Sequence, residues 1–529
     1  MPRETVAARS RAFGVITGVA GMLFGAISLP YPPGPDQGLY FYIGREMVRH
    51  GAMPYRDMLD QKTPAIYLLY AALIRVFGEH IWGIRVAEWL VIVPFALGLA
   101  RVATPRAEKT PAWLAGFAVL AANVFYFGFF DYWHTGQCEF WCAVLVGAAL
   151  WVGLRAPVRA TVGALLAGLA CGGAILFKPT VGLLVVVVLG AIVAGRSSWR
   201  ERLIASAAFA LGGALAIGAC VLWIVQRGAG AAAYDILVTF NRAYVAQERR
   251  VNDLEDVAKT VLAAHHLFDP LASFIHLWIV IGIVQFGRTG GRRIESPLVL
   301  PALVIVAGAA SVIAQLKFYP YHWGIMIVGE TLAMVVIVRQ LAEHLAALRV
   351  STVQARLVCV GAPLLLFALT GYLWGWEERV TATFRYLRTG DREAFLDPFR
   401  VEHPFHFFAK DEEAVGSWLR AHARPEDRLV VRDFHPTIYA SSGLSYGGRF
   451  FWDAYLTDPR RRREEWLAQD RADLERIKPR WVVAILPRPD MHWGDPPALA
   501  APEYFMPFGY RQVHEMYGFS IMELDAPPP

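Results

Sequence analysis

The chain has 529 residues, of which 56% are apolar and 13% aromatic, and its mean hydropathy is +0.37. Soluble domains average roughly 45–50% apolar residues, so this composition excludes an ordinary soluble protein. The formal net charge is +6, but the arginines gather between apolar segments, where membrane orientation accounts for them and nucleic-acid binding is not indicated. The sequence therefore predicts an integral membrane protein.

Apolar segments recur along the first 376 residues. A spanning helix needs about 20 mostly apolar residues. About eleven spans are expected from this length rule, at approximately 12–29, 83–101, 112–130, 139–154, 160–177, 180–195, 203–226, 271–287, 297–316, 323–341 and 356–376. The chain then becomes charged and punctuated by proline. Residues 1–376 are thus expected to form a polytopic α-helical domain, and residues 377–529 a second domain.

The links between these spans alternate in charge. One set is basic, as at Arg106, Arg155 and Arg339, whereas the link 131–139 has no lysine or arginine. Basic links face the cytoplasm, so the N-terminus is expected there and the C-terminal domain outside. No A-x-A-like cleavage site follows the first span, which we interpret as an uncleaved anchor.

Three motifs follow the first span in a fixed order. Asp36 opens D-Q-G-L-Y (36–40), and G-A-M-P-Y-R-D (51–57) and K-T-P (62–64) come next. Ionisable residues at the edge of a membrane are costly and usually functional. An isolated Asp36 could instead be an N-cap carboxylate on a surface helix; the ordered motifs favour a catalytic role.

These motifs resemble the first extracytoplasmic loop of the GT-C-fold glycosyltransferases, in particular the bacterial branch related to protein O-mannosyltransferases and the lipid A aminoarabinose transferase. The resemblance covers residues 30–85 most strongly and is weaker over 131–182 and 315–325. It implies that Asp36 is the catalytic carboxylate and that it acts as a general base when a sugar is transferred from a lipid phosphate. It also implies direct displacement, which inverts the anomeric configuration of the sugar.

A second polar cluster, F-F-D-Y-W-H-T-G-Q-C-E-F-W (129–141), stands at the start of the fourth span. In the GT-C fold a second acid commonly joins the first, and Glu139 is the preferred candidate, with Asp131 beside it. Asp36 and Glu139 would suit Mg²⁺ or Mn²⁺, and His134 would permit Zn²⁺, but no ligand motif decides whether a metal binds. The alternative is an interfacial aromatic belt with solvated polar groups.

Three single lysines lie at expected outer edges of the membrane: Lys62, Lys178 and Lys317. An ammonium group suits a phosphate, although snorkelling to the interface is the alternative for any one of them. The late motif K-F-Y-P-Y-H-W (317–323) resembles the loop that contacts the donor in the family, and Arg85 could be another phosphate contact or an anchor. The expected phosphate-binding residues are Lys62, Lys178, Lys317, Arg85, Tyr319, Tyr321 and His322.

The remaining segments are expected to be structural. Residues 227–270 are too long for a simple connector and predict one or two amphipathic helices on the membrane. After an opening loop, the C-terminal domain is expected to be a small extracytoplasmic α/β domain, with helices at 412–423 and 462–478, buried strands at 428–433 and 481–486, and a closing strand pair at 510–524.

The leading hypothesis is a membrane glycosyltransferase (hexosyl or pentosyl) of the bacterial inner membrane. It would move a sugar from a polyprenyl-phosphate-linked donor to an acceptor protein, lipid or glycan outside the cell. The sequence contains no Walker A motif, no G-x-G-x-x-G and no nucleophile elbow, so no nucleotide cofactor is expected. The alternatives are a transporter or flippase, for which internal repeats would be typical, and a non-catalytic binder of lipid-linked sugars.

Overall fold

A computed structural model describes residues 3–247, 254–265, 297–370, 376–401, 406–452, 454–457, 463–486 and 498–525, together with positions 277, 280 and 284. The chain forms two compact units. The first contains Met1–Leu29, Arg85–Val221 and Gln247–Trp376, and the second contains Pro30–Ile84, Leu222–Ala246 and Glu377–Pro529. One boundary between the units falls at 376/377, and the second unit also takes in the motif-bearing loop, because that loop packs against the C-terminal region.

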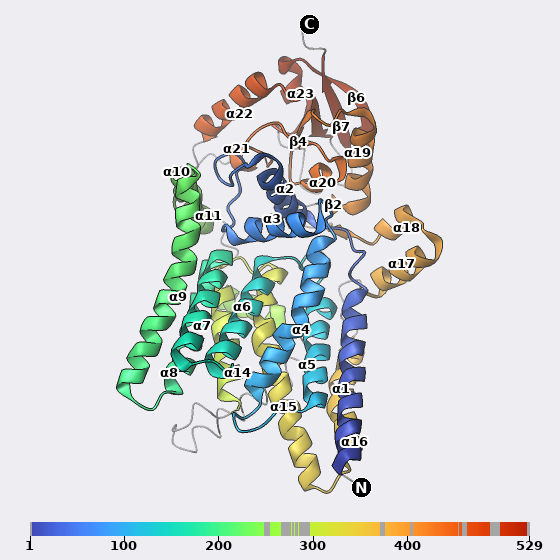
Figure 1. Cartoon of the computed structure of the whole chain (residues 1–529). Coiled ribbons are helices and arrows are strands. Elements are labelled where there is room, and N and C mark those ends of the chain that lie inside the picture. Colours follow the sequence, from blue (N-terminus) through green and yellow to red (C-terminus); the bar gives the residue numbers. More distant parts are fainter. Residues whose placement is uncertain are drawn as a thin grey trace. The chain divides into compact units, whose positions relative to one another are not determined.

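The first unit is helical throughout its described part (Figure 1). Its main elements are α1 (Arg3–Ala26), α4 (Gly83–Ala103), α5 (Ala112–Asn123) with the π-turn η1 (Val124–Gly128), α6 (Cys138–Leu154), α7 (Ala160–Phe177), η2 (Pro179–Val181), α8 (Gly182–Ala194), α9 (Trp199–Gln226), α12 (Leu254–His265), α14 (Val299–Ile313), η4 (Pro320–Met326), α15 (Ile327–Ala347) and α16 (Thr352–Thr370). Helices cover ten of the eleven expected spans, and the expected span 271–287 lies outside the described residues apart from the three isolated positions.

Four helical segments of the described chain are long and apolar enough to cross a bilayer: Gly83–Ala103, Ala160–Phe177, Trp199–Gln226 and Pro320–Ala347. Shorter apolar helices accompany them, among them Ser10–Ala26, Cys138–Leu154 and Val299–Ile313. A chain with this many apolar helices is a multi-pass membrane protein.

Glycines set the close approach of helices in the first unit. A Cβ on Gly116 would overlap the backbone carbonyl of Gly14, so α1 and α5 pack backbone to backbone. Gly168 and Gly212 play the same part where α7 meets α9. Small residues are typical of helix contacts in lipid, where van der Waals packing replaces the hydrophobic drive between helices.

The second unit contains a small mixed sheet. Its strands are β3 (Arg428–Val431), β4 (Ser445–Tyr446), β5 (Trp481–Ile485), β6 (Tyr510–Met516) and β7 (Phe519–Leu524), in the order β4-β3-β5-β7-β6. β3 runs parallel to β4 and β5, whereas β7 is antiparallel to β5 and β6. β5 is buried at every position, as expected for a strand covered on both faces. The expected closing strand pair is present.

The second unit also contains helices, some in the motif-bearing loop and others in the C-terminal region around the sheet. They are α2 (Pro35–His50), α3 (Ala65–Phe77), α10 (Gly230–Tyr234), η3 (Asp235–Phe240), α11 (Asn241–Gln247), α17 (Trp376–Thr389), α18 (Arg392–Leu396), α19 (Ala409–His422), α20 (Thr437–Ser442), α21 (Ala454–Thr457), α22 (Arg463–Ile477), α23 (Pro502–Phe505) and η5 (Met506–Phe508), with a strand pair β1 (Arg400–Val401) and β2 (Phe407–Phe408). The expected opening loop after 376 is wrong, because α17 and α18 occupy it. The sequence of α17 is amphipathic and rich in charged residues. Beside the apolar spans, this composition is typical of a loop, so the helix was not predicted.

The motif-bearing loop is held against the C-terminal region by buried polar contacts within the second unit. Arg45 on α2 donates to the carbonyl of Tyr439 at 2.7 Å, and Arg449 donates to the carbonyl of Tyr55 at 2.7 Å. The rings of Tyr42 and Tyr439 stack with centroids 4.3 Å apart. The C-terminal region therefore supports the loop that carries Asp36.

Candidate active site

Asp36 lies in the first turn of α2. Gly34 is the N-cap residue and Pro35 takes the first helical position, so the alternative that Asp36 is itself the N-cap is wrong. The Gln37 side chain accepts the N–H of Gly34 instead. The Asp36 side chain is 12% exposed, and its Oδ2 lies 4.0 Å from Nζ of Lys62. The first and third sequence motifs thus meet through a carboxylate and an ammonium group.

Hydrogen bonds fix the backbone that presents Lys62. The Tyr55 hydroxyl donates to the Lys62 carbonyl at 2.9 Å, and the Tyr67 hydroxyl lies 3.4 Å from the same oxygen. Nδ2 of Asn241 donates to the carbonyl of Gln61 at 2.9 Å. Tyr55 has a positive φ of 73°, a conformation rare for a bulky residue that suggests a functional constraint. The second motif therefore positions the third.

Asp60 is a second carboxylate of this loop, and the sequence analysis did not single it out. Its Oδ2 accepts from the Tyr67 hydroxyl at 2.5 Å, and its Oδ1 accepts from the N–H of Gln61 at 2.7 Å and from the Tyr455 hydroxyl at 3.2 Å. Burial raises the pKa of Asp60, while the Tyr67 hydrogen bond and the charge of Lys62 oppose the rise. With these donors in place, Asp60 orders the loop.

In the first unit, three expected residues meet from separate segments. Glu139 lies in the first turn of α6, Lys178 caps the C-terminal end of α7, and His322 lies in η4. The Lys178 ammonium contacts Oε1 of Glu139, and Nε2 of His322 is 3.9 Å from the same oxygen. The Glu139 side chain is only 3% exposed and that of Lys178 20%. A buried carboxylate of this kind needs a cationic partner, which explains why the two residues pair.

A narrow cavity adjoins Glu139, Lys178 and His322. Thr180, Ser311, Gln315 and other residues complete its lining. The Ser311 hydroxyl donates to Oγ1 of Thr180 at 3.2 Å. The space left between these side chains is too small for a water molecule, and the Lys178 ammonium is already paired with Glu139, so a phosphate contact at this point stays a prediction.

Arg85 lies inside the first unit. Its Nη2 donates to the carbonyl of Tyr132 at 2.8 Å, its Nη1 contacts the Thr135 hydroxyl, and Nη1 is 3.9 Å from Oε2 of Glu88. Arg85 is 1% exposed. These contacts fix the turn over residues 131–137, and the expected contact of Arg85 with a phosphate stays a prediction.

Glu88 on α4 is a buried carboxylate that sequence reasoning missed. It accepts from the Tyr126 hydroxyl and from the N–H of Gly136. The available signal was an acid inside an expected span, since ionisable residues within membrane segments are rare and usually paired. Glu88 holds the turn that leads into α6 and so helps to place Glu139.

Asp131 and His134 lie in that turn and bond locally. Oδ1 of Asp131 accepts from the N–H of Tyr132 at 2.5 Å, and Nδ1 of His134 accepts from the N–H of Asp131 at 3.1 Å. Both residues are buried, at 7% and 2% exposed. The expected roles of Asp131 in catalysis and of His134 in metal binding stay predictions.

The late motif forms an aromatic group beside His322. The Tyr319 and Tyr321 rings stack with centroids 5.5 Å apart, and the ring of Tyr321 meets that of His322 edge-on at 4.8 Å. Lys317 lies between Leu316 and Phe318, both of which have positive φ values (55° and 51°). Backbone strain of this kind clusters at functional sites.

A divalent metal, which the sequence analysis left open, does not fit the donor set around Glu139. The Lys178 ammonium already contacts Oε1 of Glu139, and a cation on that oxygen would compete with a metal ion. Across the described residues, no group of three or more His, Cys, Asp or Glu side chains gathers as a metal site. We derive no chemical step through a metal.

These observations define a class: a multi-pass helical protein with paired carboxylate and lysine side chains and a small C-terminal sheet. The family model described as dolichyl-phosphate-mannose-protein mannosyltransferase matches residues 61–225. The sequence matches none of the curated proteins.

Among solved structures, the chain is similar to ArnT from Cupriavidus metallidurans bound to undecaprenyl phosphate, with 13% identity and a TM-score of 0.57 over 97% of this chain and 98% of that one. It also matches the archaeal oligosaccharyltransferase AglB from Archaeoglobus fulgidus in complex with an inhibitory peptide and a dolichol-phosphate, with 13% identity and a TM-score of 0.45 over 89% of this chain and 69% of that one. The similarity to ArnT shows that the chain has the GT-C fold, and the family match confirms the resemblance drawn from the loop motifs.

Proposed function

We propose that this chain is a membrane glycosyltransferase that transfers a sugar from a polyprenyl-phosphate-linked donor to an acceptor on the outer face of the bacterial inner membrane. The observation that carries the proposal is the pairing of Asp36 with Lys62 at 4.0 Å on a loop fixed by Tyr55, Tyr67 and Asn241. A partly exposed carboxylate beside an ammonium group suits proton removal next to a phosphate.

In this mechanism the acceptor nucleophile attacks the anomeric carbon of the donor. Its proton passes to the Asp36 carboxylate, the new bond forms at the anomeric carbon, and the bond to the phosphate oxygen breaks. The electron pair of that bond leaves with the polyprenyl phosphate, and Lys62 offsets the charge that grows on it. Attack from the side opposite the leaving group would invert the anomeric configuration.

Within the first unit, Lys178 and His322 beside Glu139 and the stacked Tyr319 and Tyr321 are proposed, with Lys317, as contacts for a lipid phosphate. The proposal specifies neither the sugar nor the acceptor, and no step in it uses a metal ion.

The test compares cells with the gene, without it, and with the Asp36→Asn variant, by mass spectrometry of extracytoplasmic glycans and glycoproteins. We expect one glycan to lose a single sugar in both the deletion and the variant. If the protein is instead a flippase or a non-catalytic binder, the Asp36→Asn variant should restore the full glycan to cells that lack the gene. That result would contradict the proposed sugar transfer.

A further inference from the structure

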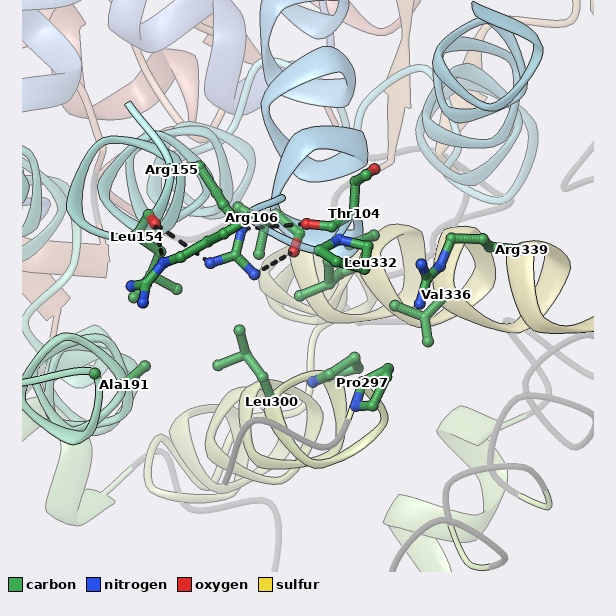
Figure 2. A pocket seen from close by; sticks show the side chains of 15 residues that line it. Thr104, Arg106, Leu154, Arg155, Ala191, Pro297, Leu300, Leu332, Val336 and Arg339 are labelled. Atoms are coloured by element: carbon green, nitrogen blue, oxygen red, sulfur yellow. Dashed lines mark hydrogen bonds between the residues drawn. The ribbon is translucent and has the colours of Figure 1, made fainter. Parts of the chain in front are cut away.

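A cavity of about 280 Å³ lies within the first unit (Figure 2). It opens where α4, α6 and α8 end and where α14 and α15 pass, and it shares no lining residue with the cavity beside Glu139. Pockets for small molecules usually measure roughly 300–1,000 Å³. The cavity lies just below this range, so it suits a small group such as a phosphate rather than a whole lipid, and it belongs to no part of the proposed catalytic site.

Three arginines line this cavity: Arg106, Arg155 and Arg339. Figure 2 shows Arg106 and Arg155 near Leu154 and Thr104, and Arg339 farther along beside Val336. The three arginines come from separate segments of the sequence, and the fold brings these segments to one cavity. This concentration of positive charge on one cavity suits an anion.

The hydrogen bonds that Arg106 and Arg155 donate to carbonyl oxygens around the cavity are long. The three guanidinium nitrogens of Arg155 lie 3.3 Å from the carbonyls of Thr104, Leu154 and Val102, and Nε of Arg106 lies 3.4 Å from that of Leu154. Such distances exceed the 2.7–3.2 Å range typical of N–H···O bonds. A phosphate oxygen would form shorter, charge-assisted bonds with the same groups.

Arg339 gives an independent indication. It lies in the interior of α15, so capping of a helix end does not explain it, and its side chain is 11% exposed. Within the described residues, its buried Nε has no hydrogen-bond acceptor. Its carboxylate neighbours, Glu343 at 3.5 Å and Glu108 at 3.9 Å, are each 60% exposed, and ion pairs to such exposed groups are weak.

The other wall of the cavity is apolar. Leu300, Pro301, Leu332 and Val336 line it, and Leu300 lies across from Arg106 in Figure 2. A free ion would gain nothing from these side chains, whereas the glycerol and first acyl carbons of a lipid would pack on them.

We propose that this cavity binds a phosphate group, presented by an anionic phospholipid whose headgroup carries no balancing cation. Basic pockets between membrane helices on the cytoplasmic side are suited to anionic headgroups, and the charge pattern of the sequence predicts that all three arginines lie on the cytoplasmic side. Arg106, Arg155 and Arg339 bind the phosphate oxygens, and the apolar wall takes the start of an acyl chain.

The test uses the full-length chain, purified in neutral detergent, stripped of lipid and titrated with phosphatidylglycerol, phosphatidylcholine or inorganic phosphate. Binding is followed by native mass spectrometry and by the shift in thermal unfolding temperature. We expect the combined variant Arg106→Gln, Arg339→Gln to bind phosphatidylglycerol at least about tenfold more weakly, because two charge-assisted contacts are lost. The matched control is Arg159→Gln, an exposed arginine of the same basic side that does not line the cavity.

The arms separate the possible sources of the phosphate. Stabilisation by phosphatidylglycerol alone supports a lipid ligand, and stabilisation by inorganic phosphate that the same variants abolish supports the cavity as a site for a free ion. Equal binding of phosphatidylcholine and phosphatidylglycerol, or unchanged binding by the combined variant, overturns the proposal. If the combined variant does not fold, the binding of phosphatidylglycerol is measured with Arg106→Gln alone. Arg106 is exposed, so this single change should leave the helix packing intact.

Discussion

Asp36 and Asp60 belong to the same loop but differ in what surrounds their oxygens. Asp60 is 4% exposed and accepts hydrogen bonds from Tyr67, Tyr455 and the N–H of Gln61. Asp36 keeps part of its surface and faces an ammonium group at 4.0 Å. A general base must be within reach of the proton that it removes, so we propose that role for the more exposed Asp36 and a positioning role for Asp60.

Replacement of Asp36 with asparagine tests this assignment. Asp36→Asn keeps the size of the side chain but removes the proton acceptor, so transfer should fall by roughly 10²–10⁴-fold. The protein should lose only about 0.3–1 kcal/mol of stability, because the lost charge lies at the positive end of the α2 dipole and its pairing with Lys62 is a long contact of 4.0 Å. Transfer kinetics and thermal unfolding of the purified variant measure the two effects.

A matched control for this variant is Asp391→Asn. Asp391 is the N-cap of α18, and its side chain accepts from the N–H of Ala394 at 3.0 Å. Asparagine caps about as well as aspartate, so this change should leave both transfer and stability intact. Transfer by Asp36→Asn at the level of this control would remove the catalytic assignment.

The three lysines should contribute unequally to donor binding. A lost charge-assisted contact with a phosphate costs about 1.5–3 kcal/mol, so at least one of the variants Lys62→Ala, Lys178→Ala and Lys317→Ala should raise the donor KM roughly tenfold or more. Lys62→Ala is the clearest case, because Lys178→Ala would also leave buried Glu139 without its ammonium partner. Steady-state kinetics measure the donor KM of each variant, and Lys109→Ala, which changes an exposed lysine, is the reference. An unchanged KM in all three variants would show that the lysines are interfacial anchors.

At the scale of elements, the turn before α6 depends on a buried network rather than on apolar packing. The Tyr126 hydroxyl donates to Glu88 and accepts from the N–H of Gly136 at 3.0 Å. Tyr126→Phe removes a hydrogen bond to a charged group, which should lower stability by about 1.5–3 kcal/mol. Thermal unfolding in detergent checks this value, and Tyr234→Phe, whose side chain is 66% exposed, should unfold like the wild type. Equal unfolding temperatures for both variants would show that the network does not hold the turn.

The sequence predicted most elements because their patterns are strong and local. Long apolar runs gave ten helices in the described chain, and the alternation in residues 510–524 gave the β6–β7 pair. The helices α17 and α18 were missed because a charged amphipathic helix beside apolar spans has the composition of a loop.

The candidate site was predicted one residue at a time. The resemblance to the GT-C glycosyltransferases, together with positions at the edges of expected spans, indicated Asp36, Lys62, Glu139, Lys178 and His322. The pairing of Glu139 with Lys178 and His322 could not be predicted, because it depends on how α6, the end of α7 and η4 pack. The supporting groups Asp60 and Glu88 were missed for the same reason: burial, not sequence spacing, gives them their partners.

At the scale of the whole molecule, the chain forms two compact units, and each combines segments that are far apart in the sequence. The motif-bearing loop belongs with the C-terminal region rather than with the membrane helices that flank it in sequence. The buried hydrogen bond of Arg45 with Tyr439 and the stacked tyrosines at Tyr42 join α2 to that region. We infer that the C-terminal region acts on transfer through the position of α2, so that its loss would disturb Asp36 even though it carries no catalytic group.

Because the C-terminal region and the loop that carries Asp36 belong to one unit, a single fusion at the C-terminus tests on which side of the membrane both lie. The alternation of basic and bare links predicts a cytoplasmic N-terminus, and an odd number of spans then places residues 377–529 outside, together with the loop that carries Asp36. A reporter enzyme that is active only in the cytoplasm, fused after Pro529, should therefore be silent, while the same reporter fused within the basic link 155–159 should be active and serves as the control. Because the second unit contains both the loop and the C-terminal region, activity of the terminal fusion would place Asp36 in the cytoplasm as well. It would then exclude a donor on the outer face and move the arginine cavity to the outer leaflet.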